Sequence, residues 1–225
     1  AVFSWVMMVL HSLKLGYFVM VYLAERHNVR YRDFIQYISE LQMPLDMGSI
    51  LRREVALFQM QLDRILEGHE RGTVLQEYGK IYWDVEEASF LRISEKLDQF
   101  YDEMLSVVRH FLDQRGVSFS EAELAEVIQY QKARIPTFDP RTTTQWKFEY
   151  NFPEYFETVF LPTPKSILET PQILINRPKD FQDDKERYAR ETILWGRKSG
   201  TMLVGVEWHN EKEVDYPVVI GACPP

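Results

Sequence analysis

Apolar positions recur with helical spacing through the first 135 of the 225 residues. The first 24 residues form an almost continuous apolar run, which predicts a buried helix. This helix is expected to end near His27 and Asn28, because Asn tolerates the left-handed backbone conformation that is common at helix ends. Further helices are expected over approximately residues 31–41, 49–66, 84–116 and 120–135, and the one over 84–116 is the longest predicted element.

Two of these helices begin with residue pairs that are typical of a capped N-terminus. Asp84 is followed three positions later by Glu87, and Ser120 is followed three positions later by Glu123. In a capping box, the first side chain accepts a hydrogen bond from the backbone of the third helical residue, and the side chain of that residue accepts one in return. Both helix starts are therefore expected to be fixed by local hydrogen bonds.

The pattern changes after Pro136, where prolines, threonines and aromatic residues replace the long helical repeats. Strands are expected within residues 142–150, 171–176 and 202–206, and short helices over residues 153–160 and 179–196. The sequence therefore predicts a mainly α fold. A bundle-like helical domain over residues 1–135 is expected to precede a small α+β region with an irregular tail over residues 136–225.

The apolar run at residues 1–24 is also the one candidate for a membrane span, since about 20 apolar residues cross a bilayer. His11, Ser12 and Lys14 lie at its middle, and a Lys there costs about 2.5 to 3.5 kcal/mol on insertion. No second span and no signal-peptide pattern accompanies it. A buried helix is therefore the favoured interpretation, with membrane contact as the alternative.

Charge and cysteine content restrict the partners of the chain. Lys and Arg number 26 against 34 Asp and Glu, which gives a net charge of -8 and argues against a nucleic-acid partner. The single Cys223 excludes an internal disulfide, a Cys-based zinc site and an iron–sulfur cluster formed by this chain alone. A reducing, cytoplasmic compartment is the expected location.

The sequence shows no complete catalytic constellation, so no catalytic residue is predicted. The five histidines stand alone, without the Glu-x-x-His spacing of di-iron bundles, and no metal site is expected. The candidates for substrate contact are His11, on the apolar helix, and Trp83, Glu86 and Glu87, at the turn into the longest helix. The structural alternatives are that His11 is an ordinary hydrogen-bonded histidine and that Glu86 and Glu87 stabilise the start of the helix by interacting with its dipole.

Three stretches resemble the C-terminal half of cobalamin-binding radical S-adenosylmethionine enzymes. They are VYLAERHNVRYRDF (21–34) with the apolar helix before it, YGKIYWDVEEASFLRISEKLDQFYDEM (78–104), and FEYNFPEYFE (148–157) joined to YARETILWGRKSG (188–200). The resemblance implies a substrate-side domain of a methyltransferase-like enzyme, which shapes the pocket for a small-molecule or peptide substrate. It also implies that S-adenosylmethionine, a 4Fe-4S cluster and cobalamin are bound by N-terminal domains of the same protein or by a partner chain, because this chain has no Cys-x-x-x-Cys-x-x-Cys motif.

The sequence leaves a second function class open. A noncatalytic helical module, with the apolar first helix docked onto a partner or a second copy, would account for the same pattern. The chain begins at Ala1, inside an apolar run, and is therefore expected to be a piece of a longer protein.

Overall fold

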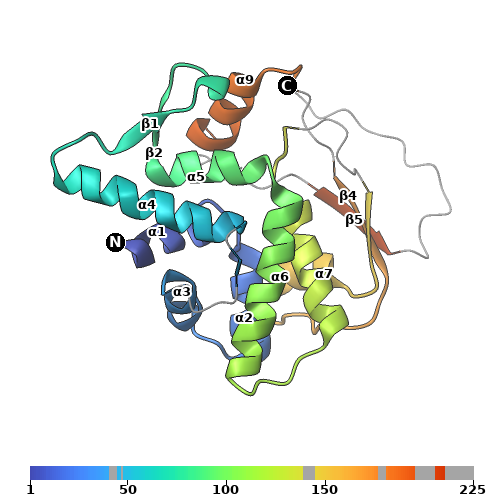
Figure 1. Cartoon of the computed structure of the whole chain (residues 1–225). Helices are drawn as coiled ribbons and strands as arrows, with labels where there is room; N and C mark the ends of the chain where they lie inside the picture. Colours follow the sequence, from blue (N-terminus) through green and yellow to red (C-terminus); the bar gives the residue numbers. More distant parts are fainter. Residues whose placement is uncertain (41–44, 47, 139–144, 177–180, 196–205, 211–225) are drawn as a thin grey trace.

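The computed structural model describes residues 1–40, 45–46, 48–138, 145–176, 181–195 and 206–210. It confirms the mainly α fold class, because helices dominate and the strands form only two small antiparallel sheets (Figure 1). The helices are α1 (Val2–Met7), η1 (Met8–Ser12), α2 (Tyr17–His27), α3 (Tyr31–Ser39), α4 (Ile50–Leu66), η2 (Gln76–Tyr78), α5 (Val85–Ser94), α6 (Leu97–Gln114), α7 (Glu121–Ala133), α8 (Phe152–Thr158), α9 (Lys185–Ala189) and η3 (Arg190–Trp195). The strands are β1 (Gly72–Val74), β2 (Tyr82–Asp84), β3 (Gln145–Phe148), β4 (Gln172–Asn176) and β5 (Val206–Asn210).

The first apolar segment is buried but is not one helix. A π-helical turn, η1, follows α1, and the chain then breaks before α2, so that the segments before and after the break differ in direction by 93°. The expectation of a continuous helix was therefore wrong, whereas its end is confirmed by Asn28, which has a φ of 52°. In the described part of the chain no single helix is long and apolar enough to cross a membrane, although this bent pair passes the same test of length and composition.

Side chains from distant helices satisfy the backbone groups at this break. The side chain of Gln131, fully buried on α7, accepts a hydrogen bond from the Phe18 N–H (2.7 Å) and donates one to the Lys14 carbonyl (2.9 Å). The Tyr101 hydroxyl on α6 donates to the Leu15 carbonyl (3.0 Å). Because buried backbone groups need partners, these contacts permit an irregular backbone inside the core.

The long helix expected over residues 84–116 is also divided. It separates into α5 and α6 at Glu95 and Lys96, where Lys96 has φ -136° and ψ 41°. The capping box at the start of α5 is confirmed, with Asp84 and Glu87 bonded reciprocally. Ser120 caps α7 as expected, but the Glu123 side chain instead binds Tyr22 and Arg26 on α2. The expected reciprocal bond at that second helix start was therefore wrong.

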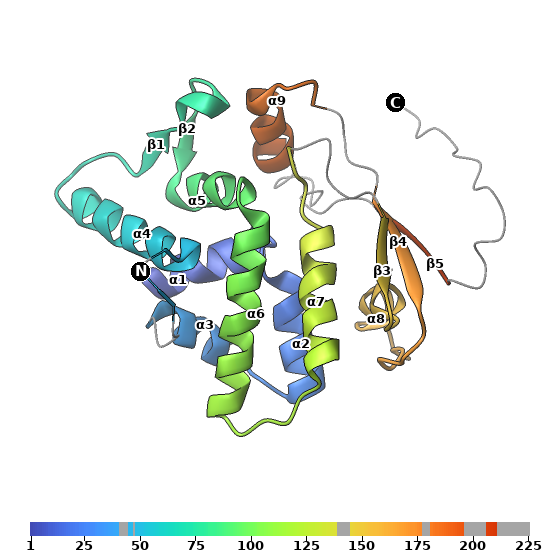
Figure 2. The same ribbon diagram turned by 45° about the vertical axis from the view of Figure 1, so that its right-hand side comes forward.

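Helices α6 and α7 run side by side, and α2 packs against α7 (Figures 1 and 2). The N-terminus of α4 is held against α6, because the Glu103 carboxylate accepts hydrogen bonds from the Ile50 and Leu51 N–H groups (2.8 and 3.1 Å). The negative charge of Glu103 also interacts favourably with the positive end of the α4 dipole.

The second sheet lies beside α7, with strand order β3-β4-β5 (Figure 2). Strand β4 pairs antiparallel with both neighbours, and its register places Trp146 opposite Leu174. Helix α8 packs on α7, and the rings of Phe18, Tyr130 and Phe156 lie within 5.0 Å of one another, centroid to centroid. Aromatic packing therefore joins α2, α7 and α8 in one core.

The expected strand at 171–176 and the helix that starts near Pro153 are confirmed. The helix expected over 179–196 is shorter, since α9 begins at Lys185. Residues 142–144 and 202–205 of the other expected strands, the glycine-flanked segment 196–200 and Cys223 lie outside the described residues.

Candidate functional site

His11 lies in η1, whereas the other three residues predicted to contact substrate lie in β2 and at the start of α5. Its half-buried ring packs against Tyr17 and Tyr31, with centroid distances of 5.5 and 6.3 Å. Burial, and then the charge of Lys14, lowers the pKa of His11. The Lys14 ammonium itself lies 4.1 Å from the centre of the Tyr17 ring. The surroundings of His11 are thus an aromatic cluster at the helix break.

Trp83, Glu86 and Glu87 lie together at the start of α5, but each has a structural environment. Trp83 is fully buried, and Glu87 completes the capping box through its bond from the Asp84 N–H (3.1 Å). Glu86 is 4% exposed and pairs with the Arg71 guanidinium (3.0 Å). Their role in substrate contact stays a prediction.

Glu86 and Arg71 belong to the wall of an apolar groove of about 240 Å³ between α1 and α4. Trp5 stacks on Phe58 there, with ring centroids 5.3 Å apart. The remaining wall is almost entirely apolar.

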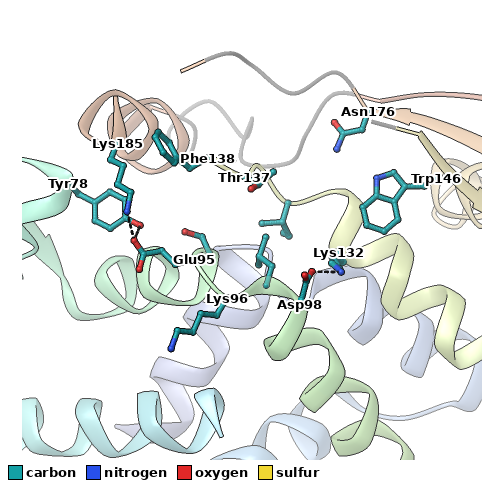
Figure 3. A pocket seen from close by; sticks show the side chains of 13 residues that line it. Tyr78, Glu95, Lys96, Asp98, Lys132, Thr137, Phe138, Trp146, Asn176 and Lys185 are labelled. Carbon is teal, nitrogen blue, oxygen red and sulfur yellow. Dashed lines mark hydrogen bonds and ion pairs between the residues drawn. The ribbon is translucent and has the colours of Figure 1, made fainter. Parts of the chain in front are cut away.

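A larger cavity, of about 430 Å³, lies where α5, α6, α7, α9 and the second sheet meet (Figure 3). None of the four predicted residues is in its wall. The lining residues are Tyr78, Ser94, Glu95, Lys96, Leu97, Asp98, Lys132, Ile135, Thr137, Phe138, Trp146, Asn176 and Lys185. The break between α5 and α6 places Glu95 and Asp98 in the wall, so an irregularity of the backbone forms part of the site.

One end of the cavity contains the carboxylate of Glu95. It accepts hydrogen bonds from the Tyr78 hydroxyl (2.9 Å) and the Lys185 ammonium (2.8 Å). Burial raises the pKa of Glu95, but the bonds from Lys185 and Tyr78 outweigh this effect, and the pKa is lowered. Lys185 also lies over the rings of Tyr78 and Phe138, with its Nζ 5.5 and 5.8 Å from their centres. Tyr78, Glu95 and Lys185 at this end are therefore hydrogen-bonded or ion-paired to one another.

The other end combines an ion pair with two residues of the sheet. The Lys132 ammonium lies 2.6 Å from Asp98 and 5.7 Å from the centre of the Trp146 ring. Asn176 lies above it, as Figure 3 shows, and donates from Nδ2 to the Ala133 carbonyl at the end of α7 (3.2 Å). Lys96 points away from this end.

Two polar atoms at this end have no hydrogen-bond partner, although both are buried. They are the indole Nε1 of Trp146 and the amide Oδ1 of Asn176, and Asn176 is only 3% exposed. An unsatisfied buried donor or acceptor costs about 1 to 3 kcal/mol. Both residues line the cavity, so a bound ligand with complementary hydrogen-bonding groups would satisfy these two atoms.

The sequence gives no signal that unites these residues. Trp146 and Asn176 are 30 positions apart on different strands, and Lys132 belongs to a helix. Only the pairing of Trp146 with Leu174 places Trp146 and Asn176 on one face, since side chains two positions apart on a strand share a face.

The described residues contain no group of three or more His, Cys, Asp or Glu side chains that could hold a metal ion. Comparison with known proteins finds no family model and no curated protein that matches the chain.

Proposed function

We propose that this chain is the substrate-side domain of a cobalamin-dependent radical S-adenosylmethionine enzyme of the methyltransferase type. In this proposal the cavity beside Trp146 and Asn176 contacts the substrate and excludes water, while the redox chemistry belongs to cofactors that other domains bind. The single observation that carries a binding role is the pair of unsatisfied polar atoms in the cavity wall.

The packing of the three resembling stretches supports one functional unit. Buried residues from each stretch belong to the same hydrophobic core, among them Tyr22, Phe90 and Phe152. The second stretch supplies Tyr78 and Glu95 to the cavity wall. A substrate-binding surface formed by these stretches would therefore be rigid, as positioning of a substrate requires.

The residues of this chain do not fit the cofactors that the resemblance implies. A 4Fe-4S cluster needs three thiolates here, and the chain has one cysteine. No reaction step is therefore assigned to the chain, and its partners in the proposal are N-terminal catalytic domains of the same protein or a separate chain. A cytoplasmic, reducing location belongs to the same proposal, because an iron–sulfur cluster is sensitive to oxidation.

The test is the composition of the natural full-length gene product, purified without oxygen. We expect iron, cobalt and S-adenosylmethionine to be bound in stoichiometric amounts. A full-length product that contains neither iron nor cobalt would contradict the proposal. The substrate contacts predicted from the sequence are tested with four variants: His11→Gln, Trp83→Phe, Glu86→Gln and Glu87→Gln. Unchanged turnover in all four would remove these residues from the substrate site.

A noncatalytic interaction module is the second candidate, and the apolar groove between α1 and α4 favours it. Leu66 on α4, one helical turn after the groove residue Leu62, is 77% exposed. Most of the first apolar segment is buried within the chain, so only those of its residues that line the groove would join the contact. Sedimentation of the full chain tests this function, which predicts self-association that Leu66→Lys weakens. A monomer that binds no hydrophobic dye would contradict it.

A further inference from the structure

The polar groups of the cavity between α6, α7 and the second sheet indicate which ligand chemistry it selects. The charged groups at its two ends already have partners: Lys185 with Glu95, and Lys132 with Asp98. Each pair combines one cation and one anion. Lys96, the remaining charged residue of the wall, points away from the end that contains Trp146 and Asn176. A charged ligand bound at that end would therefore have to disrupt the pair of Lys132 and Asp98, whereas an uncharged ligand would not.

The unsatisfied atoms are one donor and one acceptor. The Trp146 indole N–H can only donate, and the orientation of the Asn176 amide follows from its bond to Ala133. Because a carbonyl only accepts, the Nδ2 of Asn176 must face Ala133, and Oδ1 is left as an acceptor without a partner. A complementary ligand group therefore presents one acceptor and one N–H or O–H donor.

The strand register places the two residues that carry these atoms close together on one face of the sheet. Trp146 pairs with Leu174, and Asn176 is two positions further along β4, so Trp146 and Asn176 are diagonal neighbours on one face. Diagonal neighbours in a sheet lie about 7 to 8 Å apart and are within reach of one group bound between their side chains. An amide, with its carbonyl and its N–H on adjacent atoms, matches this arrangement.

We propose that this cavity binds an uncharged amide group of the substrate, with the amide carbonyl accepting from the Trp146 indole and the amide N–H donating to Asn176 Oδ1. The amide comes from a peptide bond or from a free carboxamide, and the two share the same hydrogen-bonding groups. This binding mode rests on the proposed function in that it treats the cavity as the surface that contacts substrate.

Titration of the full chain with small amides, followed through the tryptophan indole N–H resonances, tests the binding mode. The chain has five tryptophans, and the Trp146→Phe variant identifies the resonance of Trp146. N-methylacetamide represents a peptide bond and acetamide a carboxamide. We expect saturable shifts of the Trp146 indole resonance with at least one of them, and the tighter of the two identifies the source of the amide.

Two matched probes separate amide recognition from nonspecific binding. N,N-dimethylacetamide keeps the carbonyl but lacks the N–H, and we expect it to bind about fivefold more weakly, as the loss of one hydrogen bond implies. Sodium acetate replaces the amide with a charge and is expected to leave the resonance unchanged. Equal binding of the dimethyl amide, a larger shift with acetate, or no shift with either amide would overturn the proposal.

Variants provide an independent control. Trp146→Phe removes the indole N–H but keeps an aromatic ring beside Lys132. Because this variant lacks the Trp146 resonance, its amide binding is followed through the side-chain amide resonances of Asn176, and we expect binding to be about fivefold weaker. Trp5→Phe removes another buried indole N–H without a partner, in the groove between α1 and α4, and is expected to leave amide binding unchanged. An equal loss in both variants would contradict a specific role for Trp146. If Trp146→Phe fails to fold, the comparison of N-methylacetamide with N,N-dimethylacetamide on the natural chain still tests the proposal.

The amide-binding experiment and the cofactor analysis test the two proposals independently. Amide binding by this chain, together with a full-length protein free of iron and cobalt, would keep the amide site and reject the radical enzyme. Stoichiometric iron and cobalt with no amide binding would keep the enzyme and reject the amide site.

Discussion

At the scale of single residues, the buried carboxylates of Glu54, Glu86 and Glu123 each pair with an arginine side chain. Glu54 on α4 is 0% exposed, and the Arg92 guanidinium on α5 binds both of its oxygens, the closest contact being 2.6 Å. Such bidentate pairs are strong because two hydrogen bonds act in parallel. Removal of one partner leaves a buried charge, and this makes individual residues measurable determinants of stability.

We expect Glu54→Ala to lower the free energy of unfolding by about 3 to 5 kcal/mol, as for other buried ion pairs that lose one partner. The control is Glu121→Ala, which removes the exposed partner of Arg109 and should cost less than about 1 kcal/mol. Urea denaturation measures both values. Equal costs for the two variants would show that burial does not distinguish these pairs.

Glu95 gives a pH-dependent prediction at the cavity. Its pKa is lowered in the folded chain, so its ionised form stabilises the fold above the ordinary pKa of 4.5. This contribution is lost as the pH falls from 4.5 through the lowered pKa, because the protonated carboxyl no longer pairs with Lys185. Its size is below about 1 kcal/mol, since the pair is partly exposed to solvent.

We therefore expect Glu95→Gln to be less stable than the natural chain at pH 6, with the difference shrinking as the pH falls below 4.5. Unfolding midpoints measured between pH 6 and pH 3 test this trend. A difference that grows toward low pH would contradict the assigned direction of the pKa.

At the scale of elements, the two helix breaks are stabilised by contacts from elsewhere in the chain. The Gln131 side chain on α7 binds backbone groups on both sides of the break between η1 and α2. The break between α5 and α6 places Glu95 beside Lys185 and Asp98 beside Lys132. The second break therefore lies in the wall of the cavity, between its two ion pairs.

Gln131→Leu should destabilise the chain by about 2 to 4 kcal/mol, because the Phe18 N–H and the Lys14 carbonyl lose their partners inside the core. Hydrogen exchange is expected to accelerate at the Phe18 amide. The control is Gln36→Ala on the exposed face of α3, which should change stability by no more than about 0.5 kcal/mol. Unchanged exchange at Phe18 in Gln131→Leu would contradict the bridging role.

At the scale of the whole molecule, one hydrophobic core extends through the helices and into the segment after Pro136. Phe18 and Tyr130 on the helices pack against Phe156 on α8. The carboxylate of Glu126 on α7 accepts hydrogen bonds from the Glu149 and Tyr150 N–H groups at the end of β3 (2.8 and 3.0 Å). Both apolar and polar contacts thus join the sheet to the helices.

We expect the chain to unfold in a single cooperative transition, because neither part can separate without exposing shared aromatic surface. Differential scanning calorimetry should then give a ratio of calorimetric to van't Hoff enthalpy close to one. Two resolved transitions would contradict this expectation and would favour independent domains over residues 1–135 and 136–225.

The sequence by itself determined the features that depend on neighbouring residues. These include the mainly α class, the capping box of Asp84 and Glu87, the end of α2 at Asn28 and the strand that became β4. Each follows from hydrogen bonds or hydrophobic periodicity within a few positions, which a linear pattern records.

Tertiary structure alone decided where the helices break and which polar groups meet. Glu123 binds Tyr22, 101 positions away, and Gln131 binds Lys14, 117 positions away. Trp146 and Asn176 share a face only through the register of β3 and β4. Local periodicity cannot encode these contacts, because they depend on the packing of whole elements, and that packing forms the cavity in which we place the site.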